Sequence, residues 1–318
     1  MIHGGEIAFG PGEEFRLIRR MLRRYGALAD GVGDDAATVP VGPGETMVLS
    51  TDASVEGVHF RRGWFSPGEL GYRAVTAAAS DLAAMGARPV GMLVALTIPE
   101  RWRAELDDIG DGIARAARAT SLRILGGNTS DGADLSLTVT VVGAVRAGEI
   151  LTRTAARAGD RVYVTGRLGA PGAALRSLIA GAEPAPVFRG RLAEPVARIS
   201  EARWLAGQGA RAAIDISDGL LADAGHVAAA SHVHLAIELE RLPLVEGVRP
   251  ADAARSGEEY ELLVTSPIPL DQDAFAARFA IPLTEIATVQ DGDPRVTILH
   301  GDRTVTLRDR GHDHFRRR

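Results

Sequence analysis

Six aspartates stand at positions where a carboxylate has little structural use. They are Asp34, Asp35, Asp52, Asp81, Asp215 and Asp218. Asp52 ends the apolar run 47–49, and Asp215 interrupts the apolar run 212–216. Burying one unpaired carboxylate is costly, and burying several near one another costs more. Because Mg²⁺ takes carboxylate oxygens and keeps coordination positions open for phosphates, this pattern indicates an enzyme that handles Mg²⁺ and phosphate groups.

Asp81 is predicted to lie on the apolar face of a helix. Leu70, Ala74, Ala78 and Met85 recur at helical spacing, and Asp81 falls on the same side. A semi-exposed position near the helix end is the alternative. An aspartate near a helix C-terminus opposes the helix dipole, so a positive group is expected close to it.

The other acidic segments each have a structural alternative as well. Asp52 follows Ser50 and Thr51, whose oxygens are possible metal ligands, but it could equally lie in a turn or cap a helix. Ser217 or Asp218 could cap a helix that begins near residue 220, although a cap does not explain Asp215.

Two glycine-containing segments, 126–130 and 166–169, could present backbone amides to an anion, but either could be an ordinary turn. The chain has no Walker-type phosphate loop and no Gly-x-Ser-x-Gly nucleophile motif. A histidine such as His59 is, taken alone, more often structural than a ligand.

These residues must be positioned by a mixture of helices and strands. Predicted helices cover 13–24, 67–85, 101–120, 173–180 and 220–230, and 275–279 is predicted to be part of a further helix. Predicted strands cover 47–51, 90–98, 135–145, 161–165, 212–217 and 261–265, and 295–307 has the pattern of a hairpin. The absence of a strict βαβ alternation favours a mixed α/β (α+β) class over a doubly wound sheet.

Composition limits the possible classes further. A length of 318 residues favours two domains, predicted as 1–148 and 149–318, because the stretch 146–160 has the composition of a linker. A net charge of −5 without a basic block argues against a nucleic-acid partner. The chain has no cysteine, which excludes disulfides and thiolate chemistry. Without a signal-peptide pattern or an apolar run of about 18 residues, we expect no membrane segment and a cytoplasmic protein.

Seven ordered segments resemble the thiamine-monophosphate kinase family, in the superfamily of aminoimidazole ribonucleotide synthetase, along almost the whole chain. They are 33–35, 50–60, 80–87, 151–153, 214–220, 257–262 and 311–315. The resemblance implies a two-domain fold of the aminoimidazole ribonucleotide synthetase type. It also implies a homodimer whose N-terminal domains form a shared β-barrel. The N-terminal domain would bind Mg²⁺ and ATP, and the C-terminal domain would complete the active-site cleft.

The implied reaction converts ATP and thiamine phosphate to ADP and thiamine diphosphate, with several Mg²⁺ ions and ATP as co-substrate. The metal ligands implied by the resemblance are Asp35, Ser50, Thr51, Asp52, Asp81, Asn128, Asp215 and Asp218. The residues implied to face ATP are Gly127, Asn128, Arg153 and Ser217, and those implied to face thiamine phosphate are His59, Glu258 and Phe315. A phosphate nucleophile has a second pKa of about 6, so no general base is expected.

The sequence departs from the family pattern at Asn128, where the family has a metal-binding aspartate. It departs again at Glu259, in place of aspartate, and at Ser256, in place of glycine. The alternatives are another ATP-using enzyme of the superfamily or a degenerate ligand-binding protein, for which Asn128 is the only indication. The superfamily members that depend on cysteine or selenocysteine do not fit a chain without cysteine.

Overall fold

The computed structural model describes residues 20–29, 39, 41–301 and 303–307. Three of the sequence-based candidates, Asp34, Asp35 and Phe315, lie outside these residues. The chain divides into two compact units. Unit 1 comprises the described residues up to Leu82 together with Arg88–Ala147, and unit 2 comprises Ala83–Ala87 and the described residues from Gly148 onward.

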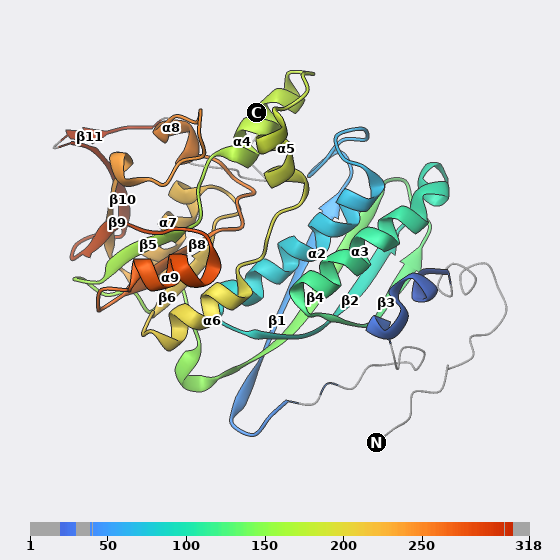
Figure 1. The fold of residues 1–318 in the computed structure, drawn as a ribbon, viewed down its shortest axis with the longest axis horizontal. Coiled ribbons are helices and arrows are strands. Elements are labelled where there is room, and N and C mark those ends of the chain that lie inside the picture. The colour runs from blue at the N-terminus through green and yellow to red at the C-terminus, as the bar shows by residue number, and fades with distance from the viewer. Residues whose placement is uncertain (1–19, 30–38, 40, 302, 308–318) are drawn as a thin grey trace. The chain divides into compact units, whose positions relative to one another are not determined.

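Unit 1 is a four-stranded sheet covered by helices on one face (Figure 1). The strand order is β1-β4-β2-β3, in which only the β2–β3 pair is parallel. The strands are β1 (Glu45–Val55), β2 (Arg88–Thr97), β3 (Arg123–Ser130) and β4 (Ser136–Arg146). The helices are α2 (Pro67–Ala84) and α3 (Leu106–Thr120), with 3-10 turns η1 (Gly26–Ala29), η2 (Glu100–Glu105) and η3 (Ala147–Glu149).

Glycines allow α2 and α3 to approach each other closely. A Cβ on Gly112 would lie 1.9 Å from the carbonyl oxygen of Gly68, and a Cβ on Gly71 would lie 2.2 Å from that of Ile109. Any larger residue at Gly71 or Gly112 would push the helices apart. The paired helices therefore form one rigid layer that fixes the position of Asp81 on α2.

The two faces of the unit 1 sheet differ in composition. Val139 and Val141 of β4 are fully buried, while Met47, Leu49 and Leu93 on the opposite face are 40%, 60% and 40% exposed. The sheet is open at β1 and β3, and the described residues form no closed barrel. The dimer β-barrel predicted from the sequence is therefore not seen in the single chain.

Unit 2 is a seven-stranded mixed sheet in the order β11-β10-β7-β9-β5-β8-β6. Its strands are β5 (Arg161–Thr165), β6 (Ala212–Asp215), β7 (His234–Glu238), β8 (Leu262–Ser266), β9 (Leu283–Gln290), β10 (Arg295–His300) and β11 (Arg303–Val305). Its helices are α4 (Ala170–Ile179), α5 (Pro186–Ala193), α6 (Ile199–Gly207), α7 (Leu220–Ser231), α8 (Pro250–Ala253) and α9 (Gln272–Phe279), with the 3-10 turn η4 (Leu239–Arg241).

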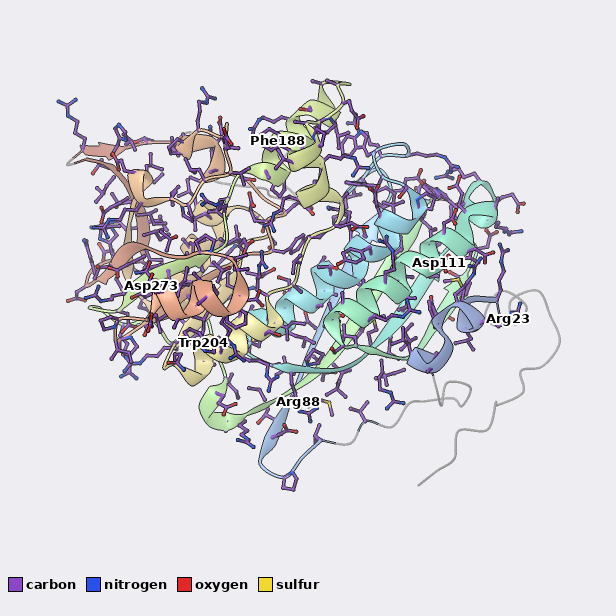
Figure 2. All side chains as sticks on the ribbon, in the orientation of Figure 1. Arg23, Arg88, Asp111, Phe188, Trp204 and Asp273 are labelled. Atoms are coloured by element: carbon purple, nitrogen blue, oxygen red, sulfur yellow. The ribbon has the colours of Figure 1, made fainter. Side chains whose placement is uncertain are left out.

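The mixed α/β class predicted from the sequence is confirmed. Within each unit, side chains from separate elements contact one another. Figure 2 labels one residue from each of two such pairs, Arg88 and Trp204. In unit 1, Arg88 of β2 pairs with Glu45 of β1. In unit 2, Trp204 of α6 packs edge-on against Phe275 of α9 at 5.7 Å between ring centroids. Among the described residues, no helix has the length and apolar character that a membrane crossing requires.

Candidate active site

Strand register and helix position bring two of the unit 1 candidates into contact. The Ser50 hydroxyl, on β1, donates a hydrogen bond to the Asp81 carboxylate, on α2. Because side chains alternate along a strand, Asp52 shares the α2-facing side of β1 with Ser50. The structural alternative for Asp52, a turn or a helix cap, is excluded, because β1 continues to Val55 and Asp52 pairs with Val139 inside the ladder.

Thr51 lies on the opposite face of the same strand. Its hydroxyl is 2.9 Å from the hydroxyl of Thr140, its ladder partner on β4. The sequence suggested Ser50 and Thr51 together as oxygen ligands, but the strand separates their hydroxyl groups. Only Ser50 directs its hydroxyl to Asp81.

Gly127 and Asn128 lie inside strand β3, so the predicted phosphate-binding turn is wrong at this point. A Cβ on Gly127 would lie 1.9 Å from the Val94 carbonyl oxygen, so this glycine is required for close pairing with β2. β1 and β3 are the two edges of the sheet, three strand spacings or about 14 Å apart. Asn128 and Asp52 of one chain are therefore too far apart to bind the same ion.

The turn after β1 fixes the imidazole of His59. The Val55 N–H donates to His59 Nδ1 at 3.0 Å, and the His59 N–H donates back to the Val55 carbonyl oxygen. In the neutral ring, a nitrogen that accepts a hydrogen bond leaves the proton on the other nitrogen. This hydrogen bond assigns the proton of the neutral ring to Nε2.

Glu56 anchors this turn and was not predicted from the sequence. Its Oε2 accepts hydrogen bonds from Trp102 Nε1, Arg101 and the Leu135 N–H at 2.9, 2.6 and 3.3 Å. Burial opposes ionisation of Glu56, but these hydrogen bonds outweigh it and lower the pKa of the carboxyl group. The charged Glu56 therefore ties the His59 turn to η2 and to the start of β4.

In unit 2, β6 delivers Asp215 to a short loop before α7, which we call the 215–219 loop. Asp215 is buried, and Asp218 is half-buried. The predicted cap by Ser217 or Asp218 is wrong, because the N-cap residue of α7 is Gly219, and no side chain at that position makes a capping bond. A Cβ on Gly219 would lie 3.0 Å from the Arg255 carbonyl oxygen, and the φ of Gly219 is near +121°. Both features explain why glycine occupies this position.

Asp223 organises this loop from within α7 and was missed in the sequence. Its Oδ2 accepts hydrogen bonds from the N–H groups of Ser217, Asp218 and Gly219 at 3.1, 3.2 and 3.0 Å. Burial, then the charges of Asp215 and Asp218, raise the pKa of Asp223 to about 8. The available signal was an aspartate in the first turn of an otherwise apolar helix.

His226 also lies near these carboxylates. One of its ring nitrogens and one carboxylate oxygen each from Asp218 and Asp223 all lie within 4.8 Å of one another. Two carboxylates beside an imidazole are a mixed oxygen and nitrogen donor set that can hold a divalent cation.

The segment 255–261 interlocks with the 215–219 loop. The N–H groups of Glu258 and Tyr260 donate to the carbonyl oxygens of Ser217 and Ile216 at 2.7 and 2.9 Å. Glu258 and Tyr260 both adopt left-handed backbone angles, with φ of +62° and +52°. Such strain persists only where the surroundings enforce it, and it is concentrated at functional sites.

This backbone arrangement orients the Glu258 side chain. The Tyr260 hydroxyl donates to Glu258 Oε2 at 3.0 Å, and Tyr260 is only 7% exposed. Both backbone groups of Ser217 are used internally, through Asp223 and Glu258. Ser217 therefore has its hydroxyl group to offer a ligand.

The Gly166–Gly169 loop does not form a phosphate cradle. The Gly169 N–H donates to Glu259 Oε1 at 2.6 Å, and a Cβ on Gly166 would lie 2.2 Å from Glu261 Oε1. Ser256 accepts from the Gly172 N–H in the first turn of α4. Ser256 and Glu259, two of the departures from the family pattern, thus both support the start of α4.

Glu261 is a structural carboxylate rather than a ligand. It is fully buried and accepts hydrogen bonds from Arg198, Arg191 and Thr165. Burial works against ionisation, but the charge and hydrogen bonds of Arg198, then Arg191, lower the pKa of Glu261. Arg153, in contrast, is exposed, and its carbonyl oxygen accepts from the Ser231 hydroxyl at 2.7 Å.

The candidate oxygen donors thus fall into two groups. Unit 1 contributes Ser50, Asp52 and Asp81, and unit 2 contributes Asp215, Asp218 and Asp223. Neither group adjoins a cysteine, because the chain contains none. Oxygen donors in this density fit Mg²⁺, and Mg²⁺ in turn suits phosphate ligands.

Comparison with known proteins gives the family. The AIR synthase related protein models match at residues 33–145 for the N-terminal domain and 157–299 for the C-terminal domain. The thiamine-monophosphate kinase of Escherichia coli strain K12 is 34% identical over 322 aligned residues, which cover 95% of this chain and 98% of that protein.

The chain belongs to the thiamine-monophosphate kinase family.

Solved structures of thiamine-monophosphate kinases share its fold. The crystal structure from Stenotrophomonas maltophilia K279a is 35% identical, with a TM-score of 0.79, and the match covers 90% of this chain and 96% of that one. AaThiL complexed with AMPPCP and TMP is 30% identical, with a TM-score of 0.74 and coverage of 96% and 100%. The family resemblance inferred from the ordered segments is therefore confirmed.

Proposed function

We propose that this protein transfers the γ-phosphoryl group of ATP to thiamine phosphate, forming thiamine diphosphate and ADP. The observation that carries the proposal is the match to thiamine-monophosphate kinases over almost the whole chain. AaThiL was solved with AMPPCP, a methylene analogue of ATP, together with TMP. The two groups of oxygen donors support the same reaction, because two phosphate-bearing substrates must be brought together.

The proposed ligands follow from the family resemblance. The Mg²⁺ ligands are proposed to be Asp35, Ser50, Thr51, Asp52, Asp81, Asn128, Asp215 and Asp218. The ATP contacts are proposed to be Gly127, Asn128, Arg153 and Ser217, and the thiamine phosphate contacts His59, Glu258 and Phe315. Ser50 and Asp52 share the face of β1 that carries the contact to Asp81, whereas Thr51 lies on the opposite face. A role as side-chain metal ligand is therefore better supported for Ser50 and Asp52 than for Thr51.

The reaction needs no general base. The acceptor is a phosphate monoester with a second pKa of about 6, so it is largely deprotonated at neutral pH. When bound, Mg²⁺ would offset the repulsion between the two anions and the charge that develops during transfer. The chain contributes by holding its carboxylates rigidly, which supports direct transfer rather than a covalent enzyme intermediate.

Two side chains are suited to the acceptor substrate. His59, whose ring is held by the Val55 N–H, is proposed to contact the phosphate group. Glu258, whose carboxyl group accepts from the Tyr260 hydroxyl, is proposed to contact the thiamine part of the substrate. Because both side chains are fixed by neighbouring groups, little ordering is required when the substrate binds.

We also propose a homodimer formed through the open face of the unit 1 sheet. Met47, Leu49 and Leu93 are exposed there, and a patch of apolar side chains on a sheet face favours a protein partner. A shared β-barrel of two such sheets would cover this face. We further propose that 1–148 binds metal and ATP and that 149–318 completes the site. We also propose a cytoplasmic location.

A substrate comparison tests the function. The purified protein is incubated with ATP and Mg²⁺ and with thiamine phosphate, thiamine or an aminoimidazole ribonucleotide precursor, and the products are separated by chromatography. Thiamine diphosphate should form only from thiamine phosphate, and chelation should abolish its formation. Equal turnover of thiamine, or turnover of the aminoimidazole precursor alone, would refute the proposal. Asp215→Asn serves as the inactive control.

A further inference from the structure

Asp223 reaches back from α7 to the loop that precedes it. Its Oδ2 accepts hydrogen bonds from three consecutive N–H groups, those of Ser217, Asp218 and Gly219, at 3.0 to 3.2 Å. Asp223 is only 2% exposed. A single buried oxygen therefore fixes the backbone of the whole segment that carries Asp218 and follows Asp215.

This contact decides which groups of the loop can meet a ligand. Consecutive backbone N–H groups at the start of a helix form a favourable site for a phosphate. Here those groups are already occupied by a carboxylate of the same chain, so they do not bind phosphate. The loop has the side chains of Asp215, Ser217 and Asp218 to offer, and these oxygen donors suit a cation.

We propose that Asp223 is a positioning residue for the phosphoryl transfer, a role that rests on the proposed function. It holds the 217–219 amides and thereby fixes the backbone from which the Asp218 carboxylate meets a divalent cation. The segment 255–261 holds the other side of the same loop, through the Ser217 and Ile216 carbonyl oxygens. The donor and acceptor groups of the loop backbone are thereby fixed from two directions.

A helix cap without functional consequence is the competing explanation, and the chain provides a matched control. Asp271 caps α9 by accepting from the Ala274 N–H at 2.9 Å, and it has no place in the proposed site. Asp271→Ala removes a capping carboxylate in the same way. It should lower the melting temperature and leave cation binding unchanged.

The test combines hydrogen exchange with cation binding in the full-length protein. Exchange of the 217–219 amides is measured by mass spectrometry without metal, and Mn²⁺ binding to the nucleotide-free protein is followed by electron paramagnetic resonance. Asp223→Ala should accelerate exchange at 217–219 and weaken Mn²⁺ binding by about 10- to 100-fold, as loss of an outer-shell partner does. Asp223→Asn retains one neutral acceptor, so it should weaken Mn²⁺ binding by at least about threefold but less than alanine does.

The possible outcomes separate the explanations. Unchanged Mn²⁺ binding in Asp223→Asn overturns the proposal, whether or not Asp223→Ala folds. Weaker Mn²⁺ binding in both variants with unchanged exchange at 217–219 also overturns it, because Asp223 would then be an ordinary ligand. These measurements use neither ATP nor thiamine phosphate. Failure of the parent protein to phosphorylate thiamine phosphate would therefore refute the proposed function without altering the cation-binding result.

Discussion

Glu259 and Glu261 are both buried, but within the described part of the chain only Glu261 forms an ion pair with arginine. Glu259 is 1% exposed, its Oε1 accepts from the Gly169 N–H, and its Oε2 has no hydrogen-bond partner among the described residues. Burial is the largest influence and raises the pKa of Glu259 from 4.5 to about 8. Hydrogen bonds and the charge of Arg191 oppose this rise but do not cancel it.

The raised pKa makes the stability of unit 2 depend on pH. Between pH 4.5 and about 8, the folded state keeps the Glu259 proton that the unfolded state releases, so the free energy of unfolding falls as pH rises. Each pH unit in this window is worth about 1.4 kcal/mol, so the change from pH 5 to 7.5 is about 3 kcal/mol. Below the window both states are protonated, and above it both are ionised.

Glu259→Gln removes this contribution while keeping an oxygen for the Gly169 N–H. Relative to the parent, the variant should gain about 3 kcal/mol of stability between pH 5 and 7.5. Any other group that titrates in this window, such as Asp223, is present in both proteins and cancels in the difference. The absolute stability at pH 5 is not the test, because the Gln amide needs its own partner.

The assay is urea unfolding of metal-free protein at a series of pH values. Parent and variant both carry Trp64→Phe and Trp102→Phe, so that Trp204 fluorescence reports on unit 2 alone. Glu183→Gln, at an exposed position, controls for the general effect of removing a carboxylate. A stability difference between Glu259→Gln and the parent that stays constant from pH 5 to 7.5 would show that Glu259 is ionised in the folded state.

Three further outcomes follow from the site and its supports. Glu261→Gln should destabilise unit 2 by about 3 to 5 kcal/mol, because the buried Arg198 loses its closest carboxylate and keeps only Glu201 at 3.3 Å; a melting temperature near that of the parent would contradict this. Asp215→Asn should abolish turnover yet raise the metal-free melting temperature, since it relieves repulsion within a crowded acidic group; residual turnover with Mg²⁺ would exclude a metal role. Asn128→Asp should lower the Mg²⁺ concentration for half-maximal activity, and an identical titration would remove this residue from the metal site.

Much of the fold could be predicted from local patterns. The β5 strand was predicted with its observed limits, and α2 and α7 were predicted within one residue, because strong periodicity and nearby glycines define them. The strands β7 and β9 and the helices α5 and α6 were not predicted. Their sequences lack a clear period, and they form because the sheet provides hydrogen-bonding and apolar partners.

The sequence by itself determined the chemistry available to this protein. Aspartates in apolar surroundings and the complete absence of cysteine indicate oxygen-based metal and phosphate chemistry, and these follow from residue types alone. The tertiary structure decided which of these groups can act together. Ser50 and Thr51 are adjacent in the chain, but strand alternation directs one hydroxyl to Asp81 and the other to Thr140.

The tertiary structure also decides the protonation of buried carboxyl groups. Glu259 and Glu261 are the same residue type two positions apart, yet burial raises the pKa of one while Arg198 and Arg191 lower that of the other. Asp223 lies within an ordinary helix, and the conformation of the loop that directly precedes this helix brings three amides to its carboxylate. Residue type sets which charge or donor is available, whereas partners such as Arg198 and Arg191, 63 and 70 residues before Glu261, reach it only through folding.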